Sequence, residues 1–131
     1  MVSYYKIINI LTLLKLLLLT LLLSIGIDII VNPSLRAWAE TFCISNIEVM
    51  SMSIPLVTFA VGGTGEYIDN PHDYDDDDSY TITSNAVVVH EATPEVIANA
   101  TNVLITNSTL RQQLGSAGRG ISNIIYILVN Y

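Results

Sequence analysis

Two glutamates, Glu40 and Glu48, stand with seven residues between them, and a pair of glycines, Gly62 and Gly63, follows further along the chain. Carboxylates accept hydrogen bonds from hydroxyl groups, and the start of a helix offers backbone N–H groups and a positive dipole end to an anion. Two carboxylates flanking a helix start could therefore hold a diphosphate that carries a ribose on one side and a sugar on the other. The glycines lack a Cβ, so the backbone there could approach such a ligand closely.

The elements around these residues must place them at one edge of a sheet. Residues 27–31 and 55–61 are apolar runs that predict buried strands. Ligands bind at the carboxyl ends of strands in an open parallel sheet, so the turns after both strands face one crevice. A helix is predicted over residues 42–53, with Glu40 just before it and Glu48 about 9 Å along it, at about 1.5 Å per residue. Apolar residues at spacings of three support this helix: Ile44, Ile47 and Met50.

The chain continues to alternate between strands and helices. Residues 86–89 predict a third strand, and Thr93 with Pro94 is a typical helix start. A second helix is predicted to begin at Asn107 or Ser108 and to end at one of two glycines, Gly118 or Gly120. This order favours an α/β fold with a parallel sheet. The predicted division is a leucine-rich leader (1–25), an α/β domain (26–120) with an acidic loop (69–85), and an apolar tail (121–131).

Composition excludes several functions. With only five Lys and Arg residues and a net charge of −7, the chain lacks the basic surface that nucleic-acid binding needs. A lone cysteine, Cys43, excludes an internal disulfide framework and a cysteine zinc site. The acidic run over residues 73–78 lacks the glycine and spaced glutamate of a calcium loop. We expect neither a metal nor a cofactor.

The leader has three interpretations: a membrane helix, a helix packed in a protein core, or a wrongly assigned start of the coding sequence. Residues 7–27 are long and apolar enough for a membrane helix, although Lys15 near the middle costs roughly 2.5 to 3.5 kcal/mol on insertion scales. The leader also runs without a linker into the strand that ends at Val31, which favours a helix packed in a protein core. The first interpretation predicts membrane association, with the membrane as a partner, and the second a cytoplasmic protein.

Several further motifs surround the glutamates in a fixed order. They are Asn32-Pro33-Ser34 upstream, Gly62-Gly63-Thr64-Gly65-Glu66 downstream, and the tail Leu110-Arg111-Gln112-Gln113-Leu114-Gly115-Ser116-Ala117-Gly118-Arg119. Together they resemble the retaining GT-B glycosyltransferases with a Glu-x7-Glu signature (glycosyl transferases group 1), over about residues 26–119. The resemblance implies a partial Rossmann-like parallel sheet, the C-terminal, donor-binding half of a GT-B fold, with an apolar N-terminal helix.

The resemblance also implies roles for individual residues. Glu40 would serve the donor sugar in catalysis, and Glu48 would accept from the ribose hydroxyls. The phosphates would be bound by backbone N–H groups of three residues: Phe42, Cys43 and Ile44. Gly62 and Gly63 would lie against the donor, a nucleotide-diphosphate sugar that is a substrate and not a cofactor.

The sequence departs from the family pattern at three positions. Thr41 and Cys43 replace the glycines of the family's Glu-Gly-Phe-Gly start, and Gly65 replaces the proline of its Gly-Gly-x-Pro-Glu turn. The family's basic residues and acceptor domain would lie upstream, where this chain has its leader. We therefore expect a truncated glycosyltransferase (hexosyltransferase type) with little or no turnover alone and an unknown acceptor. The alternative is a small membrane-anchored, non-catalytic protein with an acidic interaction loop.

Overall fold

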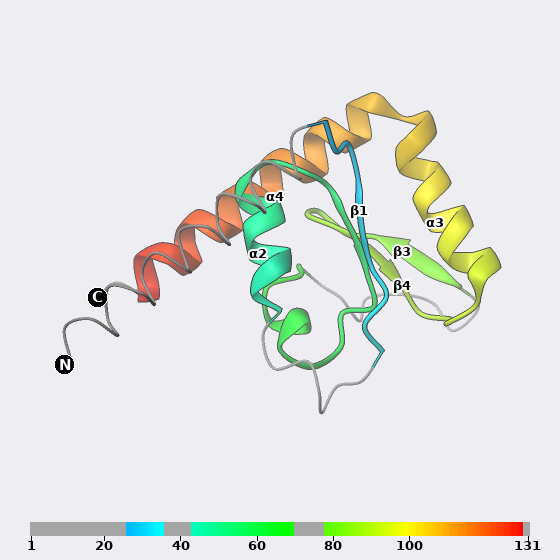
Figure 1. Ribbon diagram of the computed structural model, residues 1–131, viewed down its shortest axis with the longest axis horizontal. Coiled ribbons are helices and arrows are strands. Elements are labelled where there is room, and N and C mark those ends of the chain that lie inside the picture. The colour runs from blue at the N-terminus through cyan, green and yellow to red at the C-terminus, as the bar shows by residue number, and fades with distance from the viewer. Residues whose placement is uncertain (1–25, 36–42, 70–77, 130–131) are drawn as a thin grey trace, which may run out of the picture.

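The computed structural model describes residues 26–35, 43–69 and 78–129 of the chain (Figure 1). The elements in chain order are β1 (Ile30–Asn32), α2 (Ile44–Ser51), β2 (Leu56–Thr58), the 3-10 helix η1 (Gly62–Glu66), β3 (Tyr80–Ile82), β4 (Val87–Val89), α3 (Pro94–Thr106) and α4 (Ser108–Val129).

The strands form one mostly parallel sheet in the order β1-β2-β4-β3. β1, β2 and β4 run parallel, with Val31 opposite Val57 and Thr58 opposite Val88, whereas β3 pairs antiparallel with β4. This mixed α/β sheet confirms the predicted fold class. β3 lies inside the segment 69–85 that composition predicts to be a loop, so that prediction is wrong for residues 80–82. Residues 80–82 are types that favour strands, and they pair with β4. The neighbouring aspartates hide this preference when the sequence is read alone.

Helices cover both faces of the sheet, and the side chains of each strand alternate between two cores. On one face Leu56 and Val88 pack with Ile47 and Met50 of α2. On the other face the apolar strand residues pack against α3 and the start of α4: Val57, Val87 and Val89 against Val96, Ala100, Leu104 and Leu114. Burial on both faces explains why these strands read as continuous apolar runs.

The predicted helix starts of α3 and α4 are confirmed. The Thr93 hydroxyl accepts from the backbone N–H of Val96 at 3.3 Å. The Asn107 side-chain oxygen accepts from the backbone N–H of Leu110 at 3.0 Å, so Asn107 and not Ser108 caps α4.

The predicted end of α4 at Gly118 or Gly120 is wrong, because the helix continues to Val129. Gly118 is instead a packing residue, since a Cβ there would lie 3.3 Å from Cγ of Met50. The helix therefore includes most of the predicted tail. Its last turns expose four large side chains: Ile124, Tyr126, Ile127 and Leu128.

No helix in the described ranges combines the length and apolar content that crossing a bilayer requires. The leader, residues 1–25, and the membrane helix or core helix predicted there lie outside these ranges.

Candidate functional site

The carboxyl ends of β1 and β2 carry the elements predicted to bind a ligand. In Figure 1 these strand ends point to the lower edge of the molecule, where α2 begins and η1 lies, while α4 crosses the opposite, upper edge. Asn32 is the last residue of β1, and its side-chain oxygen accepts from the backbone N–H of Ser34 at 3.0 Å. Pro33 disfavours further strand pairing because it has no N–H. β1 therefore ends here, and its turn opens at the same edge as η1.

Cys43 precedes α2 in a left-handed backbone conformation, with φ 40° and ψ 69°. This region favours glycine and costs other residues energy. The Cys43 sulfur accepts from the side-chain amide of Asn32 at 3.0 Å and lies 3.3 Å from the Ser45 hydroxyl. It does not cap the helix. The backbone N–H of Asn46 donates to the Cys43 carbonyl oxygen at 2.9 Å. The N–H groups of Ile44 and Ser45, which have no acceptor within a helix, keep their capacity to bind an anion.

The glycine pair begins η1 directly after β2. Gly62 is exposed and has a φ of 56°, whereas Gly63 is buried. Ala60 also has a positive φ, 48°, and its carbonyl oxygen would lie only 3.0 Å from a Cβ at position 65. Any residue with a Cβ, including the proline of the family pattern, would be crowded there. The sharp turn between β2 and η1 therefore explains why Gly65 departs from that pattern.

A line of buried side chains joins the two turns. The Asn32 amide donates to the side-chain oxygen of Asn46 at 3.0 Å, and the Asn46 amide donates to the Tyr67 hydroxyl at 3.1 Å. The Tyr67 hydroxyl in turn donates to the Thr64 hydroxyl at 3.3 Å. Asn46 and Thr64 are each 1% exposed. The end of β1, the first turn of α2 and η1 are thus connected through side chains.

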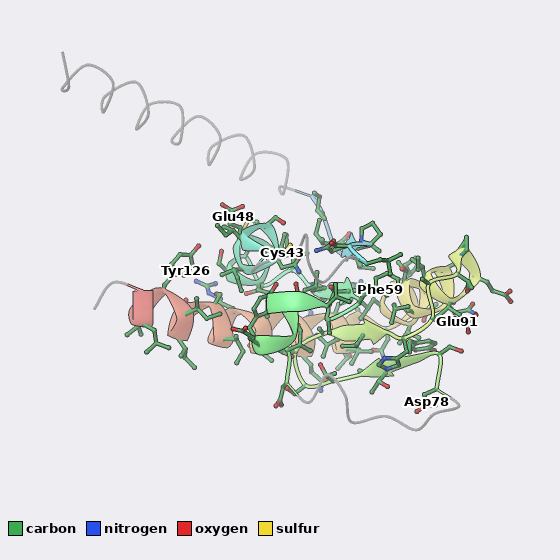
Figure 2. The ribbon with its side chains drawn as sticks, turned by 90° about the horizontal axis from the view of Figure 1, so that it is seen from below. Cys43, Glu48, Phe59, Asp78, Glu91 and Tyr126 are labelled. Atoms are coloured by element: carbon green, nitrogen blue, oxygen red, sulfur yellow. The ribbon has the colours of Figure 1, made fainter. Side chains whose placement is uncertain are left out.

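Glu48 lies on α2, one turn after Ile44, and is half-buried. Residues four apart share a helix face, and Ile44 is 68% exposed. Ile44 therefore lies on the outer side of α2. The buried side is formed by Asn46, Ile47, Val49 and Met50. Figure 2 shows the Glu48 carboxylate on the outer side of α2, away from η1. No described residue forms a salt bridge or hydrogen bond with this carboxylate.

The predicted site residues fall into two groups. Cys43, Ile44, Gly62 and Gly63 come together at one edge of the sheet, and Glu48 flanks that edge on the far side of α2. Glu40 and Phe42 lie outside the described residues. The structure therefore assembles the start of the helix and the glycine turn, while the ligand roles of all seven residues stay predictions.

Basic residues are scarce near this edge. Across residues 26–35, 43–69 and 78–110 the chain has no Lys or Arg. Arg111 donates to the carbonyl oxygens of Leu104 and Ile105 at 2.6 and 2.9 Å, which places its charge at the end of α3. The described ranges also hold no cluster of three His, Cys, Asp or Glu side chains that could bind a metal. Within the described part of the edge, an anion would therefore be held by backbone N–H groups.

The hydrogen-bonded series from Asn32 to Thr64 is not predicted by the sequence patterns. One signal was present, because Asn46 adjoins Ile47 in the predicted helix and a polar residue on a buried face needs a partner. The identity of that partner, Tyr67, depends on tertiary structure.

The sheet is mostly parallel, has helices on both faces, and carries a helix start and a glycine turn at its carboxyl edge. This architecture is that of a partial Rossmann-like fold. The family model described as "Glycosyl transferases group 1" matches residues 15–120, so the chain belongs to that family. Neither a curated protein nor a solved structure matched the chain. Family membership makes the protein glycosyltransferase-like, and it implies a sugar donor and an acceptor in general terms.

Proposed function

We propose that this chain supplies the donor-binding half-site of a retaining GT-B glycosyltransferase and binds a nucleotide-diphosphate sugar at the carboxyl edge of its sheet. One observation carries the proposal: α2 begins at the edge where the glycine turn of η1 lies. A helix start attracts a diphosphate, and glycine permits close backbone approach. Backbone N–H groups of Phe42, Cys43 and Ile44 bind the phosphates, and Gly62 and Gly63 lie against the donor.

The two glutamates of the Glu-x7-Glu pair have separate roles in this proposal. Glu48 accepts hydrogen bonds from the ribose, which is supported by its half-buried side chain without a protein partner in the described ranges. Glu40 contacts the transferred sugar and is the catalytic residue of this chain. The ribose would therefore lie along the outer side of α2 and the sugar on the glycine side.

Turnover by the chain alone is weak or absent in this proposal. Transfer of a glycosyl group leaves a nucleoside diphosphate, whose developing charge needs preorganised donors or cations. The described part of the edge supplies backbone N–H groups without Lys or Arg. The chain therefore binds the donor, and hexosyl transfer to the acceptor needs groups from elsewhere.

Thermal unfolding of the purified chain with UDP, GDP, ADP and their hexose conjugates tests the proposal. At least one ligand should raise the melting temperature, and Glu48→Ala should weaken its binding about 10- to 100-fold, because hydrogen bonds to charged groups contribute about 1.5–3 kcal/mol. Glu91→Ala is the matched control, since Glu91 is exposed and lies at the far end of the molecule from Glu48 (Figure 2). No shift at millimolar ligand, or equal losses in both variants, would contradict the proposal.

A further inference from the structure

Three side-chain hydrogen bonds connect the end of β1, the first turn of α2 and η1 in an unbroken series. Asn32 donates to Asn46, Asn46 to Tyr67, and Tyr67 to Thr64, over distances of 3.0, 3.1 and 3.3 Å. No buried side-chain nitrogen or oxygen in the described ranges lacks a partner. A fully satisfied buried network specifies one arrangement, since breaking any link leaves a polar group desolvated and unpaired.

Tyr67 is held at both ends. Its hydroxyl lies between Asn46 of α2 and Thr64 of η1, and its backbone carbonyl accepts from the side-chain amide of Asn85 at 2.8 Å. Asn85 is 1% exposed and precedes β4, and its side-chain oxygen accepts from the backbone N–H of Asp69 at 3.0 Å. Tyr67 therefore joins α2, η1 and the turn between β3 and β4.

Apolar packing holds the residues on either side of η1, Ala60 and Tyr67, in the core beneath α2, but η1 itself contributes no apolar side chain to that core. η1 contains three glycines and begins with a positive φ at Gly62. Glycine-rich backbone has the most conformational freedom to lose on ordering. The side chain of Thr64 lies in the middle of η1 and is bonded to Tyr67. The hydrogen bonds thus anchor the glycine-rich backbone of η1 to the first turn of α2.

We propose that Asn46 and Tyr67 are positioning residues that hold the start of α2 and the glycine turn as one preformed site. This inference rests on the proposed function, in which both segments contact the donor. Neither side chain contacts the donor in this proposal. A site whose two halves are fixed in advance loses less entropy on binding, so donor affinity depends on the network as well as on the contact residues.

The first test is the affinity of whichever of UDP, GDP and ADP binds the parent chain most tightly. Tyr67→Phe removes one hydroxyl and leaves the Asn46 amide unpaired, and Kd should rise about ten-fold. Tyr126→Phe, the same change on an exposed part of α4, should leave Kd unchanged. Calorimetric titration well below the melting temperature of each variant separates affinity from global stability.

The double variant Asn46→Leu/Tyr67→Phe distinguishes positioning from a structural role. The double variant removes both partners of the Asn46–Tyr67 bond, although Asn32 and Thr64 each still lose one partner. It should therefore regain part of the urea resistance that Tyr67→Phe loses. It should not regain affinity, because the side-chain hydrogen bonds that join η1 to α2 are still absent. Recovery of both stability and affinity would overturn the proposal. The double variant also serves as the binding test if Tyr67→Phe fails to fold.

Hydrogen exchange without ligand tests the coupling independently of nucleotide binding. The backbone N–H groups of Asn46 and Thr64 donate to Cys43 and Val61, so they report on the two turns. Both should exchange faster in Tyr67→Phe and keep parent rates in Tyr126→Phe. Faster exchange at Thr64 alone would overturn the coupling, even if the parent chain binds nucleotide. If both amides exchange faster in Tyr67→Phe but the parent chain binds no nucleoside diphosphate, the proposed function would be wrong and the coupling between the two segments would still hold.

Discussion

Cys43 occupies a backbone conformation that glycine adopts at lower energy than any other residue. Its φ of 40° and ψ of 69° place it in the left-handed region, which costs a residue with a Cβ about 1–2 kcal/mol. The related family has glycine here, at the end of its Glu-Gly-Phe-Gly start. Cysteine is small, and its sulfur accepts a hydrogen bond from Asn32 at 3.0 Å. Cys43 therefore adopts, with a Cβ, a backbone conformation that glycine would adopt without this cost.

Substitution of Cys43 should show whether the backbone conformation or the sulfur matters more. Cys43→Gly relieves strain, but it gives the unfolded chain more freedom and loses the two hydrogen bonds of the sulfur, to Asn32 and Ser45. The free energy of unfolding should therefore stay within about 1 kcal/mol of the parent. Cys43→Val puts a β-branched residue at positive φ and should cost about 2 kcal/mol. Urea unfolding measures both, and a valine variant as stable as the glycine variant would contradict the strained turn.

Helix α4 approaches the end of α2 through its glycines. A Cβ at Gly115 would collide with the carbonyl oxygen of Ser53, and one at Gly118 would lie 3.3 Å from Cγ of Met50. A Cβ at Gly120 would meet no atom within 4 Å. The two packing glycines therefore let α4 lie close against α2, whereas Gly120 has no such role.

The two outer glycines of this group form a matched pair of variants. Gly115→Ala should destabilise the fold by about 2 kcal/mol or more, because backbone must move to relieve overpacking. Gly120→Ala should stabilise it by about 0.5–1 kcal/mol, since alanine favours helix over glycine. Thermal and urea unfolding of both variants provide the measurement. Equal effects, or a tolerated alanine at Gly115, would show that the helices are not packed as closely as described.

The end of α2 offers a stabilising change. Ser53 has a φ of 61°, with its N–H bonded to Met50 and the next N–H, of Ile54, bonded to Val49. These two bonds form a Schellman motif, whose left-handed position usually carries glycine. Ser53→Gly should therefore raise the free energy of unfolding by about 0.5–1 kcal/mol, because it relieves left-handed strain at some cost in chain entropy. A lower urea midpoint than the parent would contradict this assignment.

The sequence predicts which segments are helices and strands better than it predicts the residues at which they begin and end. The helix starts at Thr93 and Asn107 follow from local capping chemistry, which the neighbouring residues decide. The glycines of α4 were misread as a helix end, because a glycine that permits close packing and one that ends a helix look alike in sequence. β3 was missed because its three residues stand among polar ones and their pairing with β4 is tertiary.

The candidate site could be predicted in outline from the order of its motifs. Parallel strands place their carboxyl ends at one edge, which accounts for the start of α2 and the glycine turn of η1 lying at the same edge (Figure 1). The outward direction of Glu48 and the exposure of Ile44 depend on which face of α2 meets the sheet. Three apolar residues at spacings of three did not fix that face, because the true buried side includes the polar Asn46.

At the scale of the whole molecule, an apolar core lies on each face of the sheet. The two ends of the strands differ in what covers them. α4 closes the amino ends of the strands, and the carboxyl ends carry the helix start and glycine turn (Figure 1). Apolar packing of the sheet thus supports one open edge without Lys or Arg in its described part. In the proposed function, this edge binds the donor, and catalysis needs groups from elsewhere.

The most direct test is an amide-resolved NMR titration of the folded chain with the best-binding hexose nucleotide. Resonances of residues 43–46 and 62–65 should shift together and saturate at one Kd, with α3 and β3 unaffected. The same titration of Glu48→Ala should require about 10- to 100-fold more ligand. Shifts centred on α3 or β3, or no shift at millimolar ligand, would contradict a sugar-nucleotide site at the carboxyl edge of this sheet.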